Sequence, residues 1–275
     1  MKRFIATLAA LAALASPALA AEGETHAPEP YDFSWEGPFG RFDDRQLQRG
    51  FQVYQEVCAS CHSMDLLSFR NLGQPGGPFE FLPDPEHEGE LISFANPNDN
   101  PVVMSIASGY TYTEIDLETG EEMDRAGIPA DRFPNPYANP AQAAASNGGA
   151  LPPDFSVIVK ARSGGAEYIR SLLLGYDYEV PEDVTLLPGQ HYNPYFAGGV
   201  LAMGPQLFDG AVSYADDTPQ TAEQYATDVA AFLAWASDPH MEQRKSMGLG
   251  VMIFLLIFSI LMWLAYRQVW ANVKH

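Results

Sequence analysis

The chain has 275 residues, of which 47% are hydrophobic and 18% are charged, which is enough for one sizeable domain or two small ones. Its 35 acidic residues outnumber 15 basic ones and give a formal net charge of −20. Such a surface repels nucleic acid and attracts basic proteins. The composition therefore argues against nucleic-acid binding and weakly favours a basic protein partner.

The N-terminus has the features of an export signal. Lys2 and Arg3 precede an apolar stretch, and Ala18 and Ala20 provide small residues just before a cleavage point. The apolar stretch is shorter than the ~20 residues that a membrane span needs. We therefore expect residues 1–20 to be a signal peptide, and its removal takes two basic charges with it and leaves a net charge of −22.

Residues 44–57 predict a helix, because Leu47, Phe51 and Tyr54 recur at a spacing that places them on one helical face. Directly after this helix comes the run CASCH at 58–62. This run has the form C-x-x-C-H, which is the attachment signature of a c-type haem.

The chemistry of haem attachment explains that spacing. Cys58 and Cys61 are the only cysteines of the chain, and His62 follows them directly. A helical turn presents both thiols to one edge of a porphyrin, and the adjacent imidazole can then bind the iron. A zinc site would need further ligands, and a thioredoxin-like pair needs no such histidine. We therefore expect one covalently attached haem c with His62 as an iron ligand.

Residues 72–154 are expected to be rich in loops, because twelve prolines exclude long helices from this stretch. Acidic clusters at 86–90 and 114–124 are either solvated loops or docking surfaces for a basic protein. Further along the chain, the sequence predicts a helix at 167–174 and an amphipathic helix at 221–236.

A second axial ligand decides whether a haem carries electrons or binds gases and peroxide. Met203 lies in the loop 196–205, where glycines allow the backbone to approach a flat ligand closely. The sequence favours Met203 and leaves Met104 and His191 as alternatives. The full set of candidates comprises the methionines Met64, Met104, Met123 and Met203 and the histidines His87, His191 and His240.

Residues 247–266 carry no charge and, as a helix, cover about 30 Å, which is the thickness of a bilayer core. An export signal orients such a helix, because everything before it is exported. We therefore expect an exported domain at 21–245, a transmembrane helix at 246–267 and a short cytoplasmic tail at 268–275.

Several segments, taken in chain order, resemble one known family. The run RGFQVYQEVCASCHSM at 49–64 is similar to the haem-binding helix of the cytochrome c1 family, the c-type cytochromes of the cytochrome bc1 complex. The run NGGALPPDFS at 147–156, continuing to Tyr168, resembles the second signature of that family. NPYF at 193–196, leading to Met203, resembles its methionine loop, and the run from Trp235 to Gly248 resembles the approach to its membrane anchor.

The resemblance implies roles for individual residues. It makes Met203 the sixth iron ligand and places Arg162 and Tyr168 where the family contacts a haem propionate, which suits a guanidinium group. It places Asn147 and Pro153 in the segment that lines the haem. Many relatives carry a further cysteine pair that ties a loop. This chain has none, so other contacts must hold its methionine loop.

The resemblance also implies a fold and a function. The expected fold is mainly α, a cytochrome c-type haem domain with long loop insertions and one C-terminal transmembrane helix. The expected function is electron transfer within the bc1 complex, with no enzyme activity from the chain alone. Cytochrome b and the Rieske iron–sulfur protein are the expected partners, and a basic cytochrome c is the expected acceptor. The expected location is the bacterial inner membrane, with the haem domain on the periplasmic side. An independent membrane-tethered electron shuttle and a haem peroxidase remain as alternatives.

Overall fold

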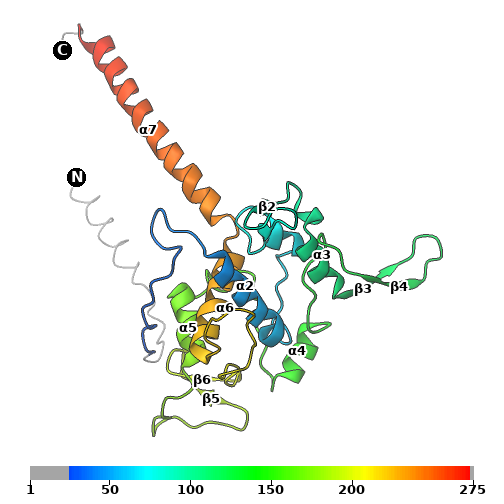
Figure 1. The fold of residues 1–275 in the computed structure, drawn as a ribbon. Coiled ribbons are helices and arrows are strands. Elements are labelled where there is room, and N and C mark those ends of the chain that lie inside the picture. Colours follow the sequence, from blue (N-terminus) through cyan, green and yellow to red (C-terminus); the bar gives the residue numbers. More distant parts are fainter. Residues whose placement is uncertain (1–24, 273–275) are drawn as a thin grey trace.

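The computed structural model describes residues 25–272 (Figure 1). The expected signal peptide at 1–20 and the end of the expected tail, 273–275, lie outside the described residues. Within them, helices are the main elements, and the strands form three separate two-stranded antiparallel sheets. This arrangement agrees with a mainly α fold.

The helical elements, in chain order, are α2 (Asp44–Val53), η1 (Tyr54–Cys58), η2 (Phe69–Gly73), η3 (Pro97–Asp99), α3 (Pro101–Ser108), α4 (Pro140–Ser146), α5 (Gly165–Leu174), α6 (Ala222–Ser237) and α7 (Met241–Trp270). The strand pairs are β1 (Phe81–Pro83) with β2 (Leu91–Ser93), β3 (Thr111–Ile115) with β4 (Glu122–Ala126), and β5 (His191–Tyr192) with β6 (Val200–Leu201). Helices α3 and α4 are short and begin with proline, which fits the expectation of a loop-rich stretch before α5.

Helix α2 leads into the cysteine motif. Its N-cap is Asp43, whose carboxylate accepts a hydrogen bond from Gln46 N at 3.0 Å. The α-helical pattern ends at Val53, and η1 is a π-helical turn in which Ala59 N donates to Tyr54 O at 2.8 Å. The predicted helix is therefore present, but its last turn is wider than expected. Single π-turns of this kind often occur at functional sites.

Helix α6 lies at the centre of the core, between α5 and α2 (Figure 1). It starts where the sequence predicts, with Thr221 Oγ1 accepting a hydrogen bond from Gln224 N at 3.3 Å. The expectation that this helix is amphipathic is wrong, because 13 of its 16 residues are buried. Helices α2 and α5 both pack on it, and Trp235 Nε1 also donates to Gly76 O at 2.7 Å.

Helices α2 and α6 cross at Gly50, where there is no room for a side chain. A Cβ atom at Gly50 would lie 2.0 Å from the Asp228 carbonyl oxygen and 2.7 Å from Phe232 Cβ. The Asp228 carboxylate, beside this crossing, accepts hydrogen bonds from Arg49 Nε and from the Tyr214 hydroxyl, both at 2.9 Å. The buried charge is therefore paired, as a charge at such a contact needs to be.

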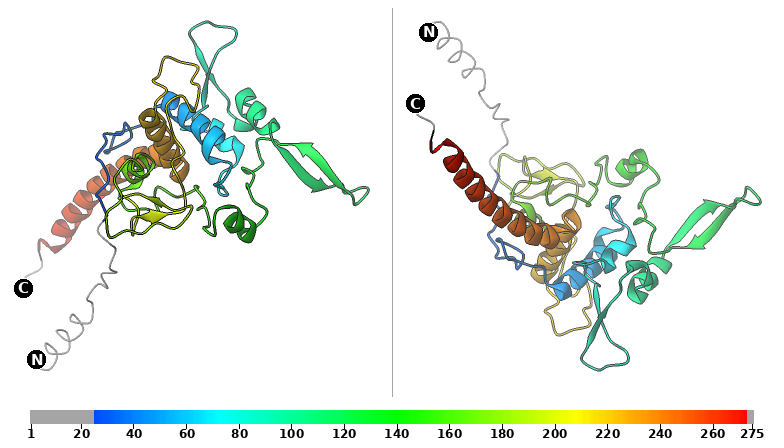
Figure 2. Two further views of the ribbon diagram at one scale, coloured as in Figure 1. Left: turned by 90° about the horizontal axis from the view of Figure 1, so that it is seen from below. Right: turned by 90° about the horizontal axis from the view of Figure 1, so that it is seen from above.

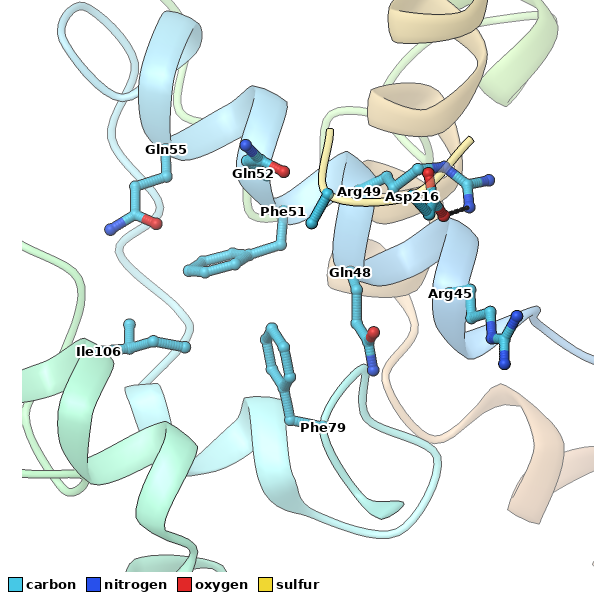
Figure 3. A pocket seen from close by; sticks show the side chains of 10 residues that line it. Arg45, Gln48, Arg49, Phe51, Gln52, Gln55, Phe79, Ile106 and Asp216 are labelled. Atoms are coloured by element: carbon cyan, nitrogen blue, oxygen red, sulfur yellow. Dashed lines mark hydrogen bonds and ion pairs between the residues drawn. The ribbon is translucent and has the colours of Figure 1, made fainter. Parts of the chain in front are cut away.

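A groove of about 490 Å³ lies beside α2 (Figure 3). Phe51, Phe79 and Ile106 point toward one another across it. The amides of Gln48 and Gln55, which also line it, are engaged with the protein, donating to Pro78 O at 2.6 Å and to the Tyr110 hydroxyl at 3.2 Å. The residues that line this groove do not include those of the cysteine motif.

Helix α7 projects away from the domain (Figures 1 and 2). Among the described residues it is the one helix that is long and apolar enough to cross a membrane, with a mean hydropathy of 2.5 in a window of which none is buried. It runs through the expected span at 246–267 and extends beyond it at both ends. Asp238 holds the junction with α6, accepting a hydrogen bond from Arg244 at 2.6 Å and pairing with Lys160 at 3.2 Å.

We predict that Gly50→Ala lowers the free energy of unfolding by about 1–3 kcal/mol, because the added methyl group overlaps a backbone carbonyl and forces α2 and α6 apart. Urea unfolding in detergent, followed by far-UV circular dichroism, measures the change. Gly248→Ala is the matched control, since a Cβ atom there meets nothing within 4 Å. Wild-type stability in Gly50→Ala would contradict the close crossing.

Candidate haem site

The two cysteines and the histidine of the motif form one tight turn at the end of η1. Cys61 N and His62 N both donate to Cys58 O, at 3.1 and 3.0 Å. Both cysteines are free thiols and partly exposed, so the pair is not joined as a disulfide. Burial, together with the neighbouring Cys61, raises the pKa of the Cys58 thiol to about 12. The turn thus offers two thiols, of which that of Cys58 is held neutral, next to an imidazole.

The His62 ring is fixed by two contacts. Its Nδ1 lies 2.8 Å from the Pro153 carbonyl oxygen, and because that oxygen can only accept, the ring proton sits on Nδ1 and Nε2 keeps its lone pair. The Phe155 ring stacks on the imidazole, with ring centroids 3.9 Å apart and planes 15° apart. Burial lowers the pKa of His62 in spite of the hydrogen bond to Pro153. A neutral imidazole with a fixed tautomer is the form that binds a metal.

Asp154 in turn fixes the segment whose carbonyl holds His62. Its Oδ2 accepts hydrogen bonds from Ser63 Oγ and from Asp65 N, both at 2.8 Å, and its Oδ1 accepts one from Ser156 N at 2.8 Å. Burial acts to raise the pKa of this carboxyl, but the hydrogen bonds outweigh it and lower the pKa below the usual range. Asp154 lies within the run NGGALPPDFS, but no pattern in the sequence alone points to its role.

Arg162 and Tyr168 lie close together, at the start of α5. Arg162 is exposed, and its Nη1 donates to Ala161 O at 3.1 Å. Burial raises the pKa of Tyr168, while the charge of Arg162 and a hydrogen bond from it act to lower that pKa. Tyr168 also interacts with Tyr176, whose pKa is raised mainly by burial. The Tyr176 hydroxyl donates to Met203 O at 3.0 Å, which connects this group to the methionine loop.

Hydrogen bonds hold the methionine loop in the absence of a cysteine pair. Asn193 is fully buried, and its Nδ2 donates to Leu172 O, near the end of α5, at 2.7 Å. The same side chain accepts a hydrogen bond from Tyr195 N at 3.1 Å. Gly175 packs directly against it, since a Cβ atom there would lie 2.8 Å from Asn193 Oδ1. The loop is therefore fastened to α5.

The other candidates for the second iron ligand differ in how deeply they are buried. Met64 is completely buried in the core, and Met104 in α3 and Met123 in β4 are 49% and 45% exposed. His191 is the alternative that shares the loop of Met203, and its ring lies against the backbone of Gly204. His87 and His240 are exposed.

Asn147 forms the C-terminal cap of α4. Its Nδ2 donates to Ala143 O at 2.7 Å and to the Tyr137 hydroxyl at 3.0 Å, so its amide is engaged within its own segment. Tyr137 and Ala143 line one side of a cleft of about 250 Å³, which Cys61 and Ser63 also line. Asn147 therefore bonds two residues of a cleft that the motif also lines.

Comparison with known proteins places this site in a family. A model described as the cytochrome C1 family matches residues 33–273. The chain belongs to the cytochrome c1 family. The two cysteines, the histidine and the methionine loop all lie within the matched residues.

Individual relatives agree with this assignment. The chain is 42% identical over 255 residues to a protein of Saccharomyces cerevisiae named "Cytochrome c1, heme protein, mitochondrial", covering 93% of this chain and 75% of that protein. It is 37% identical over 290 residues to "Cytochrome c1" of Rhodospirillum rubrum, covering 100% and 98% of the two chains. It is 41% identical over 263 residues to "Cytochrome b/c1" of Bradyrhizobium diazoefficiens, where the match covers 89% of this chain but only 36% of that longer protein.

We predict that Asp154→Asn lowers the free energy of unfolding by about 1–3 kcal/mol at pH 7, because charge-assisted hydrogen bonds to the carboxylate are lost. The lowered pKa of Asp154 gives the sign of the pH dependence. The stabilisation by the ionised Asp154 carboxylate is present above the unfolded-state pKa of about 3.9. It is lost as the pH falls through the lower folded-state pKa.

The measurement is denaturant unfolding of the wild type and the variant at pH 7 and at pH 3. The difference in the free energy of unfolding between the wild type and Asp154→Asn should be full at pH 7 and smaller at pH 3. Asp65→Asn is the control, because it removes the same charge from a residue that gives only its backbone N–H to this network. An equal loss in both variants would contradict the role of the Asp154 carboxylate.

Proposed function

We propose that the chain is the haem c subunit of a cytochrome bc1 complex and that it transfers electrons. The observation that carries this proposal is the turn of two free cysteines followed by His62, whose Nδ1 is committed to the Pro153 carbonyl. This turn stands in a chain that the family model matches over residues 33–273. Relatives named as cytochrome c1 and as a haem protein support the same function.

The residues of the motif fit a covalently attached haem c. Cys58 and Cys61 would form the two thioether bonds, and the chain has no further cysteine for a second haem. His62 would bind the iron through Nε2, while Pro153 fixes its ring and its tautomer. The haem supplies reversible one-electron chemistry, and the chain supplies its position and its surroundings.

Met203 is the proposed second axial ligand. The resemblance to the methionine loop of the family supports it, and so does the Tyr176 hydrogen bond that anchors the Met203 backbone. A thioether ligand raises the reduction potential and occupies the position that a gas or peroxide would need. A haem with both axial positions taken is suited to carrying electrons rather than to peroxidase chemistry.

Arg162 and Tyr168 are the proposed contacts to a haem propionate. An exposed guanidinium beside a phenol hydroxyl provides donors that suit a carboxylate, and the two side chains interact in the structure. Pro153 and Asn147 are proposed to line the haem, the first through the His62 contact and the second through its hydrogen bonds to two residues of the cleft beside the motif.

We propose that the chain is anchored in the bacterial inner membrane by a single span at 246–267, with the domain at 21–245 on the periplasmic side. The long apolar helix α7 supports the span. The predicted signal peptide at 1–20 supports the orientation, because it directs what precedes the span to the outside and leaves residues 268–275 in the cytoplasm. The chain would then present a cytochrome c-type haem domain at the membrane surface.

Cytochrome b and the Rieske iron–sulfur protein are the proposed partners, with the Rieske protein as electron donor. The name of the Bradyrhizobium relative, "Cytochrome b/c1", supports the association with cytochrome b. A basic cytochrome c is the proposed acceptor. The net charge of −20 and the exposed acidic hairpin β3–β4 would attract such a protein and raise its rate of association at low salt.

We predict that Met203→Leu lowers the reduction potential of the haem by on the order of 100 mV, because axial ligands tune haem potentials over about 0.8 V. The reduced variant should also bind carbon monoxide, since the sixth position is then open. A redox titration monitored by visible absorption measures the potential. The visible spectrum of the reduced variant under carbon monoxide measures the binding. Met104→Leu removes a half-exposed methionine and should leave both properties unchanged. A wild-type potential in Met203→Leu would rule out this ligand.

The subunit assignment is tested by isolation. We predict that an affinity-tagged chain, extracted from its native membrane in mild detergent, brings cytochrome b and the Rieske protein with it and shows quinol–cytochrome c reductase activity. An independent electron shuttle would be isolated alone under these conditions, so recovery of the chain as a single haem protein would favour that alternative.

A further inference from the structure

We propose that the loop of residues 35–42 is a second membrane contact beside α7, with Phe39 inserted into the lipid interface. The proposal rests on the membrane span proposed for α7. The loop lies just before α2, and Figures 1 and 2 show it, in blue, beside the base of α7 in all three views.

Lys245 ties this loop to α7. Its Nζ donates hydrogen bonds to three carbonyl oxygens of the loop, those of Trp35 at 2.6 Å, Gly37 at 2.7 Å and Gly40 at 3.3 Å. An ammonium group has three N–H donors, so the loop can occupy all of them. One lysine of the membrane helix therefore holds the whole turn of the loop.

A second tie fixes the other end of the loop. Phe42 N donates to Glu242 Oε1 at 2.9 Å, and Arg41 Nε lies 4.0 Å from the second oxygen of the same carboxylate. Glu242 and Lys245 are three residues apart and lie on one face of α7. The loop is therefore bound to α7 at two points and cannot move independently of it.

The position of Lys245 sets the depth of the loop. It stands two residues before the uncharged run that begins at Met247, which is about 3 Å along a helix axis. The carbonyls of Gly37 and Gly40 bind its Nζ, and Phe39 lies between them in the chain. Phe39 is therefore held at the level where α7 enters the apolar layer.

Phe39 differs from the other aromatic residues of this region. Phe33, Trp35 and Phe42 pack in a row, with ring centroids 4.3 Å apart for the first pair and 5.0 Å for the second. Phe39 instead is 78% exposed. An exposed aromatic ring at the boundary of a membrane span matches the aromatic residues that sit among lipid headgroups.

The backbone and the charges of the loop fit the same contact. Gly37 has a φ of +70°, and a Cβ atom at Gly40 would lie 2.0 Å from Glu36 O, so both glycines are needed for so tight a turn. The Arg41 side chain is 81% exposed. In a chain of net charge −20, an exposed cation beside an exposed ring favours phosphate headgroups over a basic protein surface.

Spin labels on the full chain, carrying its haem and reconstituted in phosphatidylcholine vesicles, test this contact. A nitroxide is attached at Phe39→Cys, and its collisions with oxygen, which concentrates in lipid, are compared with those of a water-soluble nickel chelate. Labels at Ile257→Cys, in the middle of α7, and at Leu117→Cys, which is 97% exposed in the β3–β4 turn, are the lipid and water references. The wild-type chain, whose two cysteines would be held in thioether bonds to the haem, gives the background labelling.

We expect collisions with oxygen to dominate for the label at position 39, as for the label at position 257. Collisions with the nickel chelate should dominate for the label at position 117. In a Lys245→Met background the Phe39 label should shift toward water, because the tie to α7 is removed. A Phe39 label as open to nickel as that at Leu117, with Ile257 in lipid, would overturn the lipid contact alone. Shielding of Phe39 from both reagents would also overturn it, since a protein would then cover the ring. A label at Ile257 that is open to water would overturn the membrane span, and this contact with it.

Discussion

The Pro153 carbonyl oxygen lies 2.8 Å from His62 Nδ1, and this hydrogen bond joins two segments that are 91 positions apart in the chain. It sets the tautomer of the imidazole and leaves the lone pair on Nε2, the atom proposed to bind the iron. The surrounding contacts serve to keep this bond in place: Phe155 stacks on the ring, and Asp154 fastens the Pro153 segment to the residues after the motif. Without this carbonyl, Phe155 would still stack on the ring, but nothing would fix the tautomer of His62.

The core places the motif where this bond can form. The motif turn continues directly from α2, and α2 is held against the buried helix α6 by the backbone contact at Gly50. The paired charges of Arg49 and Asp228 lie beside the same crossing and join the two helices. Because α6 is followed closely by α7, one continuous set of contacts connects the candidate haem site to the long apolar helix.

Short-range patterns in the sequence were sufficient to predict the motif, the apolar helix and the helices near 167–174 and 221–236. Each of these depends on spacing within a few residues. The sequence could not show contacts between distant segments. The role of Asp154 depends on groups about 90 positions away, and the tie of Lys245 to Trp35 spans 210 positions.

Burial around a helix is likewise a property of the assembled fold. Alanine-rich α6 has enough polar residues to suggest an amphipathic helix, yet Asp228 and Thr227 are buried because Arg49 and Arg170 reach in to bond them. The absence of a cysteine pair near the methionine loop left open what holds that loop. The structure answers this with Asn193 and Tyr176, two polar side chains whose partners lie on other segments.

The most direct test of the proposed haem attachment is the mass of the denatured chain, purified from cells that make c-type cytochromes. One haem should stay bound after denaturation, and peptide fragmentation should place it on the segment that contains Cys58 and Cys61, with a thioether bond to each. An intact mass equal to that of the polypeptide alone, with two thiols free to react, would contradict the account.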